Sequence, residues 1–151
     1  MLKIKHEGTG NLFYATKESA GFDICANENT EIPPGEWRLV STGLRIVESA
    51  GVGTLTIQGL PVMVLPEIQL RPRSGLAAKN GITILNAPST IDADYRGEIK
   101  VNLINHSKVS FVVNAGDRIA QGVCALIFQA DGIFVKDTER GSGGFGSTGT
   151  N

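Results

Sequence analysis

Hydrophobic residues occur in short runs along the chain, and turn-forming residues separate these runs. Pro-Pro-Gly at 33–35, Asn-Gly at 80–81 and Ala-Gly-Asp at 115–117 are the clearest turn signals. The spacing of apolar residues fits a helix only briefly, around residues 74–79. Many short strands between turns are typical of a β-sandwich or β-barrel, so the pattern predicts an all-β domain. The expected strands are residues 2–6, 36–41, 44–47, 54–58, 62–65, 68–71, 82–85, 98–104, 110–113, 118–128 and 133–135.

Two of the expected strands differ in the pattern of their faces. Along residues 98–104, Ile99, Val101 and Leu103 alternate with polar residues, which predicts one buried and one solvated face. Residues 123–128 are instead apolar on both faces, which predicts a strand that is covered on two sides. In a domain of this size, such double coverage indicates an interface between subunits.

Two glycine-rich segments have no pattern of this kind. Residues 48–69 carry Gly51, Gly53 and Gly59 among apolar residues, and they read as one extra hairpin without evident chemistry. Residues 140–151 combine five glycines with an arginine, a phenylalanine and several hydroxyls. Glycine lets backbone N–H groups approach a ligand closely, and arginine suits phosphate oxygens. The segment is therefore a candidate mobile lid over a nucleotide, while a plain disordered terminus remains the alternative.

Composition narrows the class of protein. A chain of 151 residues fits one domain with a single core, and a formal net charge of −1 gives no general attraction to nucleic acid or membrane. Cys25 and Cys124 lie among apolar residues without metal-ligand spacing, so we expect two buried thiols in a reducing compartment. The first residues lack the apolar core of a signal peptide, and no apolar run reaches membrane length. We therefore expect a cytoplasmic protein without a membrane partner.

Residues 90–97 form the densest polar cluster, in the connection between two expected strands. An extended backbone would place Asp92 and Asp94 on the same side. A carboxylate in that position is suited to take a proton from water, which is the task of a general base. The alternative is that aspartate, tyrosine and glycine here only form a turn.

Three other places carry groups that suit anions or metal ions. Arg73 and Ser74 stand where a strand ends and the short helix begins, which is suited to an anion. The alternative there is a Ser74 that only caps the helix beside solvated arginines. Asp23 follows a tight turn that precedes a strand, and Asp117 stands beside Arg118 at a strand start. A surface ion pair between Asp117 and Arg118 is the simpler interpretation of the last pair.

Taken in order, five segments resemble the motifs of the trimeric dUTPase family, the deoxyuridine triphosphate nucleotidohydrolases. The resemblance covers essentially the whole chain and includes the unusual glycine-rich tail. Its motifs match residues 20–26, 72–77, 86–97, 116–121 and 140–149. The family implies hydrolysis of dUTP to dUMP and pyrophosphate, which supplies dUMP for dTMP synthesis and keeps uracil out of DNA.

The resemblance implies roles for individual residues. Asp92 corresponds to the base that activates water for in-line attack on the α-phosphorus, and Tyr95 to the residue that packs under deoxyribose and excludes a 2′-hydroxyl. Phe145 would stack on uracil. The implied substrate-binding residues are Arg73, Ser74, Gly75, Asn86, Thr90, Ile91, Asp92, Tyr95, Lys100, Gln121, Arg140, Phe145, Gly146, Ser147 and Thr148.

The resemblance also implies an architecture and a metal ion. The expected fold is an all-β, β-clip or jelly-roll-like barrel that forms a homotrimer, with each active site assembled from three subunits. Residues 1–139 would form the barrel, and residues 140–151 a lid that orders when substrate binds. Mg²⁺ would be held mainly by the triphosphate, with Asp23 reaching it through a water molecule, which suits a cation that keeps part of its hydration shell.

The sequence departs from the family pattern in two places. The segment before Arg71 is longer than usual, because of the expected hairpin within residues 48–69. Ser89 stands where the family commonly has glycine, on the floor of the uracil-binding hairpin. Two alternatives to dUTP hydrolysis are a dCTP deaminase-like relative and a nucleotide-dependent module that binds a protein partner through the extra hairpin. No direct contact with nucleic acid is expected.

Overall fold

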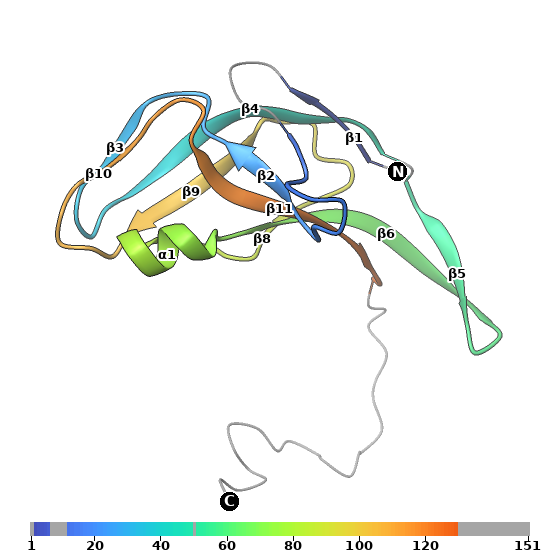
Figure 1. Cartoon of the computed structure of the whole chain (residues 1–151). Coiled ribbons are helices and arrows are strands. Elements are labelled where there is room, and N and C mark those ends of the chain that lie inside the picture. Colours follow the sequence, from blue (N-terminus) through green and yellow to red (C-terminus); the bar gives the residue numbers. More distant parts are fainter. Residues whose placement is uncertain (1, 7–11, 50, 130–151) are drawn as a thin grey trace, which may run out of the picture.

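The computed structural model describes residues 2–6, 12–49 and 51–129. Two β-sheets pack face to face, and a two-stranded ribbon and one short helix flank them (Figure 1). The first sheet has the order β1 (Leu2–His6), β4 (Trp37–Ser49), β9 (Ile99–Asn105), β7 (Ile82–Ile84). The second has the order β2 (Phe22–Cys25), β11 (Arg118–Ile127), β6 (Leu60–Arg71), β5 (Gly53–Ile57), with β8 (Ser89–Ile91) also paired to β6. The ribbon joins β10 (Phe111–Val113) to β3 (Thr30–Ile32).

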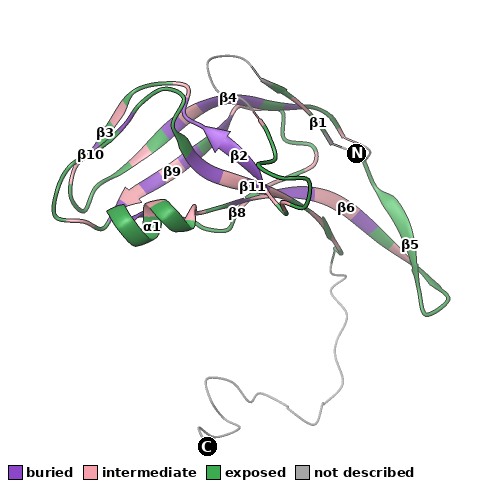
Figure 2. Ribbon diagram, viewed as in Figure 1, coloured by how far each residue is buried: buried purple, intermediate pink, exposed green. Residues whose placement is uncertain are grey.

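The core lies between the two sheets and draws on both of them (Figure 2). Its largest buried side chains include Phe22 and Leu70 from the second sheet and Leu44, Ile99 and Leu103 from the first. Burying one such side chain contributes about 1.5–3 kcal/mol, so residues that alternate inward on β9 hold the sheets together. The alternation expected along residues 98–104 is confirmed, as is the all-β, jelly-roll-like class.

Two pairs of expected strands are each one continuous strand. Residues 36–41 and 44–47 belong to β4, which changes register with β9 between Val40 and Leu44 instead of ending. Residues 62–65 and 68–71 belong to β6, because Pro66 is accommodated within the strand opposite Leu126. A single turn signal inside a strand therefore marks an irregularity and not a strand end.

The short helix and the hairpin are present. Helix α1 (Ser74–Asn80) begins after Arg73 and ends at Gly81, whose φ of 66° is the left-handed conformation that favours glycine. The alternative in which Ser74 caps this helix is wrong, since Arg73 occupies the cap position and makes no side-chain capping bond. Strands β5 and β6 form the hairpin, and Gln58 and Gly59 turn it with φ values of 51° and 81°.

The double coverage expected for residues 123–128 is not found within one chain. Leu126 and Phe128 are 58% and 54% exposed, because β11 leaves the core after Val123. Cys25 is buried as expected, but the expectation for Cys124 is wrong, since it lies exposed on this same part of β11. The strand expected at residues 133–135 lies outside the described residues. Strand β2 is the strand expected after the turn before Asp23, whereas β3 and β8 were not anticipated.

Within the described residues, no helix has the length and apolar character needed to cross a membrane.

Candidate active site

The first of three cavities lies where β8 leads into the polar cluster, and we call it the turn cavity. Its volume is about 370 Å³. It is lined by Leu39, Thr90, Ile91, Asp92, Tyr95, Glu98 and Lys100. Five of these residues carry substrate-binding predictions from the sequence, whereas Leu39 and Glu98 do not. Strands β4, β8 and β9 therefore bring residues that are distant in sequence to one concave surface.

The backbone after β8 turns at once and does not stay extended. The amide of Tyr95 donates a hydrogen bond of 3.1 Å to the carbonyl of Asp92, which closes a β-turn. The expectation that Asp92 and Asp94 share one side of an extended segment is therefore wrong. A turn in this position directs the Asp92 carboxylate outward at the end of a strand, where it is accessible to a reacting group.

Tyr95 is held at the hydroxyl end of its side chain. Its hydroxyl donates a hydrogen bond of 2.9 Å to the carbonyl of Glu98. A Cβ atom on Gly97 would lie 2.3 Å from that hydroxyl oxygen and 2.5 Å from Cζ, so only glycine leaves room for the ring. The ring consequently has a fixed position at the wall of the turn cavity.

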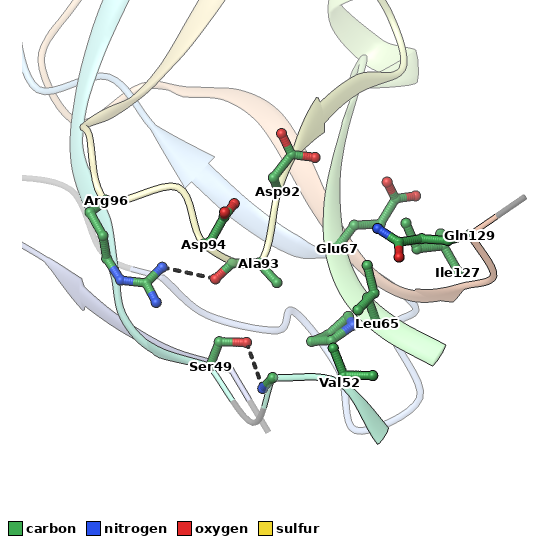
Figure 3. Close-up of a pocket in the computed structure, with 12 residues that line it drawn as sticks. Ser49, Val52, Leu65, Glu67, Asp92, Ala93, Asp94, Arg96, Ile127 and Gln129 are labelled. Atoms are coloured by element: carbon green, nitrogen blue, oxygen red, sulfur yellow. Dashed lines mark hydrogen bonds between the residues drawn. The ribbon is translucent and has the colours of Figure 1, made fainter. Parts of the chain in front are cut away.

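Asp92 also borders a second cavity, the hairpin-base cavity, of about 400 Å³ (Figure 3). The base of the β5–β6 hairpin forms its opposite wall through Ser49, Val52 and Leu65. Arg96 closes one side of it and donates a hydrogen bond of 2.8 Å to the carbonyl of Ala93. Asp92 therefore lines both cavities, so its exposed side chain is accessible from the turn cavity and from the hairpin-base cavity.

The third cavity is rich in arginine, and we call it the arginine cavity. Its volume is about 330 Å³. Its lining comes from the segment before β2, from β2 itself, from the start of α1 and from β11. The lining residues are Ala15, Ser19, Ala20, Gly21, Asp23, Arg73, Ser74, Gly75, Arg118 and Gln121.

Ion pairs fix the side chains of the arginine cavity. The Asp23 carboxylate, on a residue only 8% exposed, lies 3.1 Å from the Arg73 Nε atom and 3.1 Å from an Arg118 Nη atom. Arg73 also donates to the carbonyl of Arg118 at 3.2 Å. Two guanidinium groups around one carboxylate leave a net positive charge, while their remaining N–H groups stay available to an anion.

Gln121 joins this cavity to the strand that precedes α1. Its Nε2 atom donates a hydrogen bond of 2.8 Å to the carbonyl of Pro72, which sets the approach of β6 to the helix. Gly21 is close to Gln121, since a Cβ atom there would lie 3.2 Å from its side-chain oxygen. The motifs predicted at residues 20–26, 72–77 and 116–121 therefore meet at one place.

The interpretation of Asp117 and Arg118 as a surface ion pair is wrong. Arg118 faces Asp23 on the neighbouring strand β2, because β11 and β2 pair in antiparallel register. Asp117 instead accepts a hydrogen bond of 2.8 Å from the amide of Asn114, which stabilises the turn before β11. Arg118 is thus a residue of the cavity that sequence reasoning missed, although it lies inside a recognised motif.

The acidic and other metal-binding side chains of the described residues indicate how the expected magnesium ion would be held. No cluster of three or more His, Cys, Asp or Glu side chains suited to a metal occurs in the described parts of the chain. Asp23 borders the arginine cavity but already contacts two arginines. A magnesium ion here would therefore have to be held mainly by a bound triphosphate, with Asp23 as the carboxylate nearest to the arginines.

The remaining predicted site residues are outside these cavities. Asn86 lies in the loop before β8 and donates a hydrogen bond of 3.3 Å to the Ser89 hydroxyl, so Ser89 anchors the loop that carries it. Five residues of the tail lie outside the described residues, and their predictions stay untested. They are Arg140, Phe145, Gly146, Ser147 and Thr148.

Comparison with known proteins agrees with this geometry. Residues 62–149 match the family model described as dUTPase. A deoxyuridine 5′-triphosphate nucleotidohydrolase of Maricaulis maris is 50% identical over 152 residues, covering 96% of this chain and 91% of the relative. The fold is similar to the dUTPase of Staphylococcus bacteriophage 80alpha solved with dUpNHpp, with a TM-score of 0.79, 22% identity and 99% of both chains covered.

A second phage structure is similar in fold and concerns a metal ion. It is a dUTPase from phage phi11 of S. aureus, described for the coordination of a structural Mg(II) ion. Its TM-score is 0.73 at 21% identity, over 92% of this chain and 99% of that one. The five motifs, the three cavities and the matched family model lead to one conclusion: this chain belongs to the dUTPase family.

Proposed function

We propose that this protein hydrolyses dUTP to dUMP and pyrophosphate. Asp92 is the base that takes a proton from water, and the water attacks the α-phosphorus in line with the departing pyrophosphate. The observation that carries the proposal is the position of Asp92 in the lining of the turn cavity, together with Thr90, Tyr95 and Lys100. Turnover of this kind would supply dUMP for dTMP synthesis and keep uracil out of DNA.

In this proposal the turn cavity holds the nucleoside. Tyr95, fixed by Gly97 and by its bond to the Glu98 carbonyl, packs under deoxyribose and leaves no space for a 2′-hydroxyl. Thr90 and Ile91 read the base through the backbone of β8, and Lys100 closes the cavity opposite them. A narrow strand-edge site of this type excludes a 5-methyl group by steric contact and rejects cytosine through mismatched donors and acceptors.

The arginine cavity holds the phosphates. Arg73, Ser74 and Gly75 contact their oxygens, and Gln121 supports them from β11. When Mg²⁺ is bound with the triphosphate, it neutralises part of the phosphate charge. Asp23 holds a water of its shell and orients Arg73. In the tail, Phe145 covers uracil while Arg140, Gly146, Ser147 and Thr148 close over the phosphates.

We also propose that the active sites form between subunits of a homotrimer. The turn cavity and the arginine cavity have no lining residue in common, so one chain offers a nucleoside site and a phosphate site apart from each other. Leu126 on β11 and Phe128 just after it are exposed in the single chain, as expected for a segment that a neighbouring subunit covers.

A panel of nucleoside triphosphates, assayed for pyrophosphate with Mg²⁺, tests the activity. We expect release from dUTP and little from dTTP, dCTP or UTP. Asp92→Asn is expected to lower kcat by at least about 10²-fold, since it removes a general base, while dUMP still binds. Asp94→Asn is the matched control, because Asp94 lines only the hairpin-base cavity, and it should keep most activity. Full activity of Asp92→Asn would refute the assigned base.

The β5–β6 hairpin supports a second role, in binding a protein partner. Residues 50–66 contain no charged side chain, and Leu60 and Met63 on β6 are 68% and 59% exposed. Such exposed apolar surface is typical of a contact site. A shortened hairpin that keeps dUTP hydrolysis but loses a protein captured by the full chain would support this role. Equal capture by both forms would contradict it.

A further inference from the structure

Strand β4 contains two residues more than the part of β9 that it faces. Val40 pairs with Val101 and Leu44 pairs with Ile99, so β4 advances four residues while β9 advances two. The backbone amides inside this bulge are turned out of the regular ladder and need other acceptors.

A single carboxylate oxygen supplies those acceptors. Glu98 Oε1 accepts hydrogen bonds from the amide of Thr42 at 3.2 Å and the amide of Gly43 at 2.9 Å. The Ser41 hydroxyl donates to the same oxygen. The Glu98 side chain is only 19% exposed, so these bonds are made where water competes weakly. Glu98 therefore fastens the beginning of β9 to the bulge of β4.

The ionisation of Glu98 is consistent with this arrangement. Burial raises the pKa of its carboxyl, but bonds from Ser41, Gly43 and Thr42 and the charge of Lys100 lower it, and the pKa lies below its usual value. The carboxylate form is thus the one that the surrounding groups stabilise.

The other polar groups of Glu98 reach the turn cavity. Its carbonyl accepts the hydrogen bond of 2.9 Å from the Tyr95 hydroxyl, and its Oε2 atom lies 3.7 Å from the Lys100 ammonium. Tyr95 and Lys100 both line that cavity. Moving Glu98 would therefore move the carbonyl that orients Tyr95 and the carboxylate that faces Lys100.

We infer that Glu98 is a positioning residue for the nucleoside, which it serves by fastening β9 to the β4 bulge and so fixing Tyr95. This inference rests on the proposed hydrolysis of dUTP. Its expected signature is in specificity, because the Tyr95 ring distinguishes deoxyribose from ribose. A looser ring admits a 2′-hydroxyl more easily, whereas the chemistry at Asp92 is not directly affected.

The test compares Glu98→Ala, Glu98→Gln and the control Glu36→Gln. The side chain of Glu36 makes an exposed ion pair of 3.5 Å with Arg38, and Glu36 lines none of the three cavities. Steady-state kinetics with dUTP and UTP are measured well below the unfolding temperature of each variant. For Glu98→Ala we expect KM for dUTP to rise and the dUTP-to-UTP ratio of kcat/KM to fall by about tenfold, the scale of a displaced binding group. Glu98→Gln keeps an acceptor oxygen. On a logarithmic scale, its dUTP-to-UTP ratio of kcat/KM should therefore fall by no more than half of the decrease seen in Glu98→Ala.

A Glu98→Ala protein with a lower unfolding temperature but wild-type KM and wild-type discrimination would overturn the inference, since that result means a structural role alone. If Glu98→Ala does not fold, Ser41→Ala decides, because it removes one donor to the carboxylate and leaves Glu98 in place. It should lower the same ratio, and an unchanged ratio would also overturn the inference.

Binding measurements distinguish a failure of this inference from a failure of the proposed function. Calorimetric titration with dUMP and UMP needs no turnover. If the wild-type protein released no pyrophosphate from dUTP, the proposed hydrolysis would fail. A preference for dUMP over UMP that Glu98→Ala reduces and Glu36→Gln keeps would still support the positioning role of Glu98. Equal preference in all three proteins would reject it.

Discussion

At the residue scale, the position of the Tyr95 ring requires a glycine at residue 97. A methyl group at this position would overlap the Tyr95 hydroxyl and ring, at 2.3 Å and 2.5 Å. Gly97→Ala must therefore displace Tyr95, at a cost of about 1–3 kcal/mol. We expect KM for dUTP to rise by roughly tenfold, which steady-state kinetics measure. Gly53→Ala is the control, because its Cβ would meet Val64 at an ordinary distance of 3.7 Å, and it should leave KM unchanged.

Glu98 gives a pH dependence at the same scale. Its pKa is lower in the folded chain than its usual value of about 4.3, so it stabilises the fold above that value. The contribution is lost as pH falls below about 4.3 and the carboxylate becomes protonated. Chemical denaturation at several pH values should show a steeper loss of unfolding free energy for wild type than for Glu98→Gln in that range. Parallel curves would contradict the expected contribution. The other ionisable groups that line the turn cavity, Lys100, Tyr95 and Asp92, are present in both proteins, so the comparison isolates the contribution of Glu98.

The sequence predicted most residues of the candidate site that lie within its motifs, although it missed Arg118 inside the motif at residues 116–121. Thr90, Ile91 and Asp92 follow one another along β8 and its turn, so the resemblance of one continuous motif, residues 86–97, was enough to indicate them. Leu39 and Arg118 reach their cavities through strand pairing: β4 with β9, and β11 with β2. No local pattern encodes such pairing, because register depends on the whole sheet.

The β5–β6 hairpin is the element whose removal should matter least for catalysis. Its strands pair with each other, and all of β5 is exposed (Figure 2). Gly53 and Val64 are register partners, so an Asn-Gly turn can join them in place of residues 54–63. We expect this variant to keep dUTP kcat within about twofold and to unfold within a few degrees of wild type, since few buried apolar groups are lost. A large loss of kcat would show that the hairpin supports the hairpin-base cavity.

Element boundaries were predicted less well than element types, for an identifiable reason. Gly43 and Pro66 lie in gaps between expected strands, yet β4 and β6 continue through them. In β4 the bulge is stabilised from outside the strand by Glu98, which lies 55 residues from Gly43. Turn residues report local backbone preference, while long-range bonds decide whether the strand resumes.

At the scale of the whole molecule, the two cavities proposed for the nucleoside and for the phosphates share no lining residue within one chain. Asp92 borders the turn cavity, whereas Arg73 and Gln121 line the arginine cavity. The end of β11 and the residue after Ile127 carry exposed apolar side chains, Leu126 and Phe128, beyond the core. The pattern of residues 123–128 indicated an interface, and the exposure of these side chains supplies the surface for one. Only an assembly with cyclic symmetry would bring a turn cavity of one subunit to the arginine cavity of the next in every copy.

Subunit mixing tests that assembly directly. Asp92→Asn removes the base from the turn cavity, and Arg73→Ala removes a phosphate contact while Asp23 keeps its pair with Arg118. If each site joins two subunits, co-refolding the two inactive variants in equal amounts creates sites that have both intact parts. Random assembly gives about a quarter of such sites, so about a quarter of wild-type activity should return. Each variant refolded alone should stay inactive. A mixture as inactive as its components, in trimers shown by mass spectrometry to contain both variants, would place the complete site within one subunit.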